Sequence, residues 1–195
     1  LHYLSELSET SPQKLLGHKE VSSIYTSFSI PLVPIGQIKD FIEQFKLSRF
    51  PSLKIKINNE EALERVQEVR KHFKGKLRLD ANEAFTDFDQ LVNFTKDVNQ
   101  FQIEFLEQPF PAEFHQQYFD LQGLSPILIF ADESLTNQDI TDYFPERFDG
   151  VVVKLMKAGS FFKATKQLRE ARAKGMYTML GCMVETSVGI SGAMY

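Results

Sequence analysis

The 195-residue sequence contains no tryptophan, one cysteine and no apolar run approaching the ~18 residues that a membrane span needs. The single cysteine, Cys182, excludes an internal disulfide and favours a reducing compartment, so we expect a cytoplasmic protein. The net charge of −4 includes no long run of one sign, which argues against nucleic acid or a membrane surface as a partner. The four histidines are scattered without metal-ligand spacing, so zinc is not expected.

The hydrophobic content of 43% is enough for a sizeable core in one domain. Short apolar segments alternate with segments of helical apolar spacing, and glycine, proline or asparagine separates many of them. Strands are predicted at residues 21–30, 53–57, 77–80, 101–106, 126–131, 148–155 and 176–180. Helices are predicted at residues 1–16, 35–45, 60–73, 85–98, 114–121, 136–144, 161–174 and from residue 187 onward.

This alternation predicts a parallel (β/α) barrel of the TIM type, with about seven strand–helix units and no eighth. An open doubly wound sheet is the competing fold, but it usually carries a glycine-rich phosphate turn after its first strand, and none is present. The residues that end five successive strands recur at intervals of about 25 positions. They are Lys56, Asp80, Glu107, Asp132 and Lys154.

The segment 53–57 carries two lysines two positions apart, which a strand directs to the same face. Two ammonium groups on a buried face repel each other, and burial disfavours their charged forms. Lys54 and Lys56 are therefore expected to face carboxylates or an anionic substrate. The alternative is an edge strand with both lysines in water.

Functional groups of such barrels lie at the carboxyl ends of the strands. Asp80, Glu107 and Asp132 end three successive predicted strands, with lysines on both sides. Taken singly, each is more often a helix cap or a loop residue. Taken together, three convergent carboxylates need a cation, and an all-oxygen ligand set favours one Mg²⁺ ion.

These groups predict a proton-transfer reaction. A metal beside the acids can hold a substrate carboxylate and stabilise an enediolate, while Lys56 and Lys154 exchange the α-proton from opposite faces. Each lysine must be neutral when it acts as a base, and neighbouring cations lower its pKa. Lys54 is assigned to electrostatic stabilisation. Asn82 and Glu133 are expected to support the ligands rather than to bind the metal.

The sequence resembles the enolase superfamily in its mandelate racemase and muconate-lactonizing branch, and within it the dipeptide epimerases such as those acting on L-Ala-D/L-Glu. The matching segments are 53–56, 78–82, 107–109, 131–134, 153–157 and 181–187. The resemblance implies that Asp80, Glu107 and Asp132 bind the metal and that Lys56 and Lys154 form the acid/base pair. It also implies that Thr26 on the first strand, and Cys182 and Val184 on the seventh, line the substrate site. Without the family, Thr26 would be an ordinary strand threonine and Cys182 an ordinary buried thiol.

Two departures from the family pattern affect the expected domain organisation. Residues 1–17 are expected to be the last helix of an α+β capping domain, and residues 18–195 a barrel that stops before the eighth strand. In dipeptide epimerases that strand carries an Asp-x-Asp that binds the substrate ammonium. We therefore expect a piece of a longer polypeptide.

The resemblance implies a Mg²⁺-dependent epimerase or racemase acting on a small-molecule carboxylate, most similar to a dipeptide epimerase. The alternatives are an o-succinylbenzoate synthase or N-acylamino acid racemase, and a catalytically silent barrel fragment that acts as a binding module. The oligomeric state is left open, with a homo-oligomer as one option.

Overall fold

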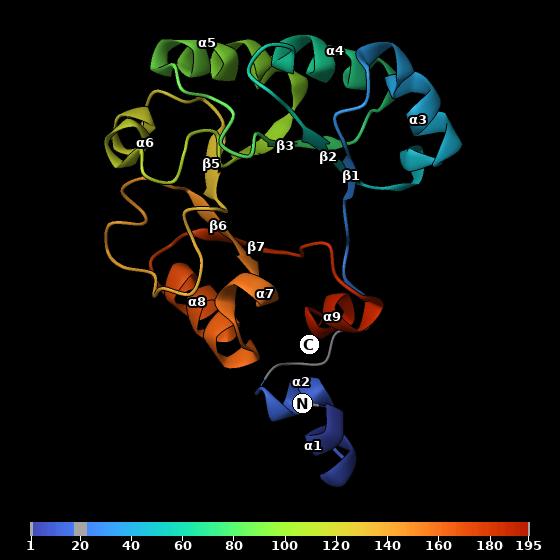
Figure 1. Cartoon of the computed structure of the whole chain (residues 1–195), viewed down its shortest axis with the longest axis vertical. Coiled ribbons are helices and arrows are strands. Elements are labelled where there is room, and N and C mark those ends of the chain that lie inside the picture. The colour runs from blue at the N-terminus through green and yellow to red at the C-terminus, as the bar shows by residue number, and fades with distance from the viewer. Residues whose placement is uncertain (1, 18–22, 195) are drawn as a thin grey trace.

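The computed structural model describes residues 2–17 and 23–194, in which seven parallel strands form one curved sheet (Figure 1). Each strand pairs with the next strand in the sequence, in the order β1 to β7. The fold is therefore a partial (β/α) barrel, as the alternation predicted. The strands are β1 (Phe28–Ile30), β2 (Ser52–Lys56), β3 (Lys76–Asp80), β4 (Ile103–Glu107), β5 (Leu128–Ala131), β6 (Gly150–Lys154) and β7 (Tyr177–Gly181).

Helices follow most of the strands and cover the convex side of the sheet (Figure 1). None of the helices in the described ranges is long and apolar enough to cross a lipid bilayer. The longer helices are α3 (Ile38–Gln44), α4 (Ala62–His72), α5 (Phe88–Val98), α6 (His115–Leu121) and α8 (Phe161–Ala173). Short helices are α1 (His2–Leu7), α2 (Pro12–Leu15), α7 (Leu155–Ala158) and α9 (Ser187–Gly192), with 3₁₀ turns η1 (Ile35–Gln37), η2 (Leu47–Arg49) and η3 (Asn99–Phe101).

The buried side chains form two separate apolar clusters because each strand directs alternate residues to opposite faces. The larger cluster includes Leu53 and Ile55 of β2 and joins the sheet to the helices. A smaller one, Phe105, Phe130 and Val152, is separate from it and lies across β4, β5 and β6. Full burial of each large apolar side chain contributes about 1.5–3 kcal/mol, so the larger cluster holds the helices on the sheet.

The predicted helix at 136–144 is wrong, because this segment consists of turns and bends. Helix α8 supplies the reason. The Gln167 side chain donates to the carbonyl groups of Thr136 and Gln138, each at 2.8 Å. The Ile140 amide donates to Glu170 at 3.0 Å. Backbone groups that a helix would bond internally are thus bonded to side chains of α8, and the threonine and aspartate residues here are weak helix formers.

The amino-terminal predictions also need correction. Residues 1–16 do not form one helix, because α1 ends at Leu7 and Ser11 caps a separate helix, α2, with Pro12 at its first position. The strand predicted at 21–30 is shortened to β1 (Phe28–Ile30), since residues 23–27 are irregular and residues 21 and 22 lie outside the described part. In the second half of the chain, the strand predicted at 148–155 ends one residue earlier than expected, because Leu155 begins helix α7.

Candidate active site

The strand register brings the predicted polar residues to one edge of the sheet. Lys56 is the Cα partner of Asp80, and Asp80 is the Cα partner of Glu107, so three neighbouring strands end in one row. Asp132 directly follows β5, and Lys154 is the last residue of β6. All five residues therefore lie at the carboxyl ends of parallel strands, where barrel enzymes place their reactive groups.

Lys54 and Lys56 face carboxylates, as their shared strand face predicted. The Lys54 ammonium bridges two acids, at 2.7 Å from Asp80 Oδ2 and 2.7 Å from Glu107 Oε1. Lys56 Nζ lies 2.8 Å from the same Asp80 oxygen and also donates to Asn82 Oδ1. The alternative of an edge strand with both lysines in water is excluded for Lys54, whose side chain is 11% exposed.

Burial and charge act against each other on these groups. Burial alone would lower the pKa of Lys54, but the nearby carboxylates of Glu107 and Asp80 offset it and raise the pKa above its usual value. Burial raises the pKa of Glu107 to about 7 against the opposing effect of Lys54, and Asp80 and Asp132 raise it further. The carboxylates of Glu107 and Asp80 therefore stabilise the protonated form of Lys54, while Glu107 titrates near neutral pH.

A second group forms around Asp132, which two lysines contact. Lys154 Nζ lies 2.6 Å from Asp132 Oδ2, and Lys157 Nζ lies 2.5 Å from Oδ1. Burial would raise the pKa of Asp132, but Lys157 and Lys154 outweigh it and lower the pKa below its usual value. The carboxylate of Asp132 is therefore stabilised in its ionised form.

Asn82 and Glu133 connect the two groups. Asn82 donates through Nδ2 to Glu133 Oε1 at 2.9 Å while its Oδ1 accepts from Lys56. Burial raises the pKa of Glu133 above its usual value.

Asn82 has a φ of 41° and Gln108 one of 40°, both in the left-handed region that residues other than glycine rarely adopt. Such backbone strain, here at the ends of β3 and β4, is typical of functional sites, where a strained backbone directs a side chain into the site.

Gln108, which is fully buried, ties β4 to the residues after β5. Its Oε1 accepts from the amides of Asp132 at 2.9 Å and Ser134 at 3.0 Å. Its Nε2 donates to Tyr118 Oη and Ser134 Oγ, each at 2.8 Å, and to the Phe110 carbonyl at 3.1 Å. This amide therefore fixes the backbone from which Asp132 projects.

The acidic residues at the strand ends are the potential ligands of a metal ion. In the described ranges, no group of three acidic, histidine or cysteine side chains is placed so that it could hold a metal ion, and lysines contact the carboxylates of Asp80, Glu107 and Asp132. Glu107 Oε2, however, is buried and has no hydrogen-bond partner. A buried carboxylate oxygen without a partner is costly unless a cation binds it. Three carboxylates on adjacent strand ends also supply the oxygen ligands that Mg²⁺ prefers, so the residues fit this ion.

The residues expected to line the substrate site lie in loops. Thr26 is exposed and precedes β1, so its predicted place on the first strand is wrong. Cys182 and Val184 lie beyond the end of β7 at Gly181, in the loop before α9. Cys182 is exposed, which excludes a buried thiol, and Val184 is fully exposed.

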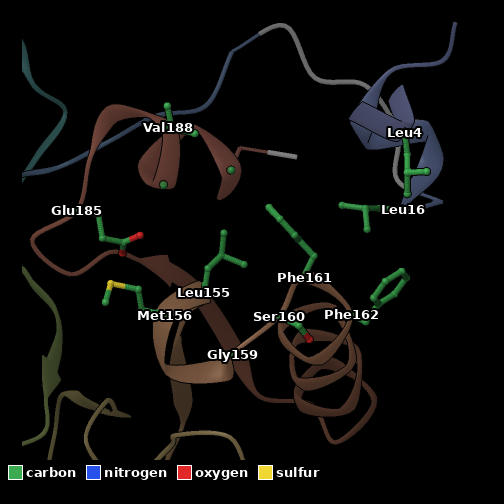
Figure 2. A pocket seen from close by; sticks show the side chains of 12 residues that line it. Leu4, Leu16, Leu155, Met156, Gly159, Ser160, Phe161, Phe162, Glu185 and Val188 are labelled. Carbon is green, nitrogen blue, oxygen red and sulfur yellow. The ribbon is translucent and has the colours of Figure 1, made fainter. Parts of the chain in front are cut away.

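A mostly apolar pocket of about 620 Å³ lies apart from these ion pairs (Figure 2). Leu4 and Leu16 from the amino-terminal segment line one side, and Phe161 and Phe162 from the start of α8 line the other. Leu155, the residue after Lys154, also lines it. None of the lysines and acids described above contributes to its lining.

The sequence reasoning missed two contributors to the site, Lys157 and Gln108. A signal for Lys157 exists, since it lies three residues after Lys154 and one helical turn would bring both to the same side. Gln108 had no comparable signal, because its role depends on the backbone conformation at its own position. These contacts define a partial (β/α) barrel whose strand ends carry buried lysine–carboxylate pairs.

Comparison with known proteins assigns this partial barrel to a family. Residues 37–194 match the family described as "Enolase C-terminal domain-like", and the chain belongs to that family. The resemblance to the enolase superfamily is thereby confirmed.

Three similar proteins illustrate the relationship. The L-Ala-D/L-amino acid epimerase of Flavobacterium johnsoniae is 33% identical over 82% of this chain and 47% of its own length. A solved L-Ala-D/L-Glu epimerase superposes with a TM-score of 0.85 at 27% identity, over 98% of this chain and 59% of that protein. A dipeptide epimerase from Enterococcus faecalis V583, complexed with Mg and the dipeptide L-Leu-L-Tyr, gives 0.77 at 28% identity, over 88% and 50%. The chain thus spans about half the length of the curated relatives it matches.

Proposed function

We propose that the protein is a Mg²⁺-dependent epimerase of dipeptides, which removes and returns the α-proton of a carboxylate substrate. The observation that carries the proposal is the order of groups along the sheet edge. Lys56 contacts Asp80 at one end of the row of acids, and Lys154 contacts Asp132 at the other. Two amines on opposite sides of a bound substrate are what inversion of a carbon requires, since one removes the proton and the other supplies it.

In this proposal Asp80, Glu107 and Asp132 would hold one Mg²⁺, which when bound supplies positive charge for the enediolate form of the substrate. Lys54, between two carboxylates, contributes a fixed positive charge beside the substrate carboxylate rather than a proton. In each direction of the reaction, one of Lys56 and Lys154 accepts the α-proton as a neutral amine, and the other returns a proton to the opposite face as an ammonium. Each lysine gives up its contact with a carboxylate to do so. The solved epimerase complexed with Mg and L-Leu-L-Tyr supports the ion and the substrate class.

The remaining parts of the proposal concern the surroundings of the site. Thr26, Cys182 and Val184 are proposed to contact the substrate, which would require the exposed loops that carry them to face it. Residues 1–17 are proposed to belong to a capping domain and residues 18–195 to the barrel. Three further properties stay predictions. They are the cytoplasmic location, the absence of nucleic acid and membrane partners, and the homo-oligomer.

Solvent deuterium uptake tests the proposal directly. The protein that carries this sequence is incubated in D₂O with Mg²⁺ and a library of dipeptides that includes L-Ala-D-Glu and L-Ala-L-Glu. We expect one deuterium per turnover at a single α-carbon, seen by mass spectrometry, together with epimerisation seen by chiral chromatography. No uptake into any dipeptide would contradict the proposal.

The Lys154→Ala variant separates the two lysines. Epimerisation should fall by at least about 10³-fold, because one proton transfer is lost. Exchange should persist on the epimer whose α-proton faces Lys56. Lys166→Ala, which removes an exposed lysine of α8, is the matched control and should behave as the wild type. Equal loss of exchange on both epimers would contradict one base on each face.

A further inference from the structure

Lys157 is a fourth lysine at the strand ends, and the fold places it beside Lys154. Helix α7 begins directly after Lys154 and spans only four residues, Leu155–Ala158. One helical turn separates the two lysines, so both side chains reach the same neighbour, Asp132. The Lys157 side chain is 16% exposed, so this contact is not a solvated surface pair.

The two lysines do not bind Asp132 in the same way. Lys154 Nζ contacts one carboxylate oxygen of Asp132, Oδ2, at 2.6 Å. Lys157 Nζ contacts the other oxygen, Oδ1, at 2.5 Å and also donates to the backbone carbonyl of the same residue. Because the Lys157 amine is bonded to both the side chain and the main chain of Asp132, it restricts the χ angles of Asp132. The Asp132 amide is meanwhile held by Gln108 at 2.9 Å, so the backbone of this residue is fixed on both sides.

We propose that Lys157 is a positioning residue for the Asp132 carboxylate. This inference rests on the proposed function, in which Lys154 must leave Asp132 to carry a proton while Asp132 serves as a ligand. Lys157 keeps the carboxylate oriented and its charge balanced during that departure. Glu107 differs, because its Oε2 is unpaired, and Asp80 receives both of its lysines on one oxygen, Oδ2. A lysine on each carboxylate oxygen is therefore found at Asp132 and not at the other two acids of the row.

The opposite interpretation is that Lys157 is only a cation that competes with a metal for Asp132. The two interpretations predict changes of opposite sign. Loss of a positioning residue around a metal ligand typically lowers metal affinity by 10- to 100-fold. Loss of a competing positive charge raises metal affinity, because less charge repels the incoming ion.

Mg²⁺ affinity, measured by isothermal titration calorimetry without substrate, distinguishes them. For Lys157→Met we expect Mg²⁺ binding about 10- to 100-fold weaker than in the wild type, with Lys157→Arg within about threefold of it. Lys157→Gln provides a second loss-of-charge variant should Lys157→Met fail to fold, as judged by circular dichroism. Lys166→Met, on the exposed face of α8, is the control and should leave the affinity unchanged.

Unchanged or tighter Mg²⁺ binding in Lys157→Met or Lys157→Gln would overturn the inference. Failure of the proposed function would look different, since the wild type would then bind Mg²⁺ without exchanging any α-proton. In active protein, a lower kcat in Lys157→Met that saturating Mg²⁺ restores would support a positioning role. A higher KM with unchanged Mg²⁺ affinity would instead indicate that Lys157 contacts substrate, and would overturn it.

Discussion

Lys54 and Lys56 lie two residues apart on one strand, yet their surroundings differ. The Lys54 side chain is 11% exposed and contacts two carboxylates, whereas Lys56 is 34% exposed and contacts one. A lysine held by two buried acids retains its proton more strongly, which agrees with the raised pKa of Lys54. The more exposed Lys56 is the better candidate for proton exchange. The shared strand face was predictable from sequence, whereas the number of acids around each amine was not.

At the residue scale, Gln108→Leu should destabilise the protein by about 2–4 kcal/mol. The substitution leaves the buried amides of Asp132 and Ser134 without an acceptor, and each unpaired group costs about 1–3 kcal/mol. Urea unfolding followed by circular dichroism measures the change. Gln116→Leu, at an exposed position of α6, should change stability by less than about 0.5 kcal/mol. Equal effects of the two substitutions would refute the assigned role of Gln108.

At the scale of elements, packing between neighbouring strands sets the positions of the side chains that we propose to react. Gly181 of β7 is the Cα partner of Lys154 on β6. A Cβ added at Gly181 would lie 2.8 Å from Val152 Cγ1 and 3.0 Å from Lys154 Cε. The glycine therefore provides the space through which the Lys154 side chain extends. The segment 136–144 shows the same dependence on a neighbour, because contacts with α8 replace the helix that its own sequence predicted.

Gly181→Ala should accordingly lower both kcat and the free energy of unfolding. Displacement of Lys154 by about 1 Å would reduce kcat by about 10- to 100-fold, whereas overpacking by one methyl group costs about 1–3 kcal/mol. Steady-state kinetics and thermal unfolding of the same preparation measure both effects. Gly36→Ala is the control, since a Cβ there meets nothing within 4 Å. Wild-type kcat in Gly181→Ala would show that Lys154 does not need this space.

At the scale of the whole molecule, burial of an acidic residue in the site makes stability depend on pH. Burial of Glu107 raises its pKa from 4.5 to about 7. The folded protein therefore binds this proton more tightly than the unfolded chain does. Between pH 4.5 and 7 this group lowers the free energy of unfolding as pH rises, and above pH 7 the cost is fully present. A bound cation would offset that cost by neutralising the carboxylate.

We therefore predict that Mg²⁺ stabilises the protein more at higher pH. The increase in Tm on adding Mg²⁺ to metal-free protein should grow as pH rises through about 7, because the ion binds the ionised carboxylate. Differential scanning calorimetry from pH 5.5 to pH 8, with and without Mg²⁺, measures the effect. Glu107→Gln lacks this ionisation, so its metal-free Tm should vary less with pH over the same range. A Tm increase that is the same at every pH in the wild type would contradict the role of Glu107.

The sequence by itself determined the alternation of strands and helices, the positions of the ionisable residues at the strand ends, and the family. These properties are local, because they follow from apolar periodicity and from short motifs. Tertiary structure alone decided which amine contacts which acid, since Lys54 bridges Asp80 and Glu107 while Lys157 joins Lys154 at Asp132. It also replaced the helix at 136–144 with turns bound to α8. Both outcomes depend on the register and packing of segments distant in the sequence, which periodicity within one segment does not encode.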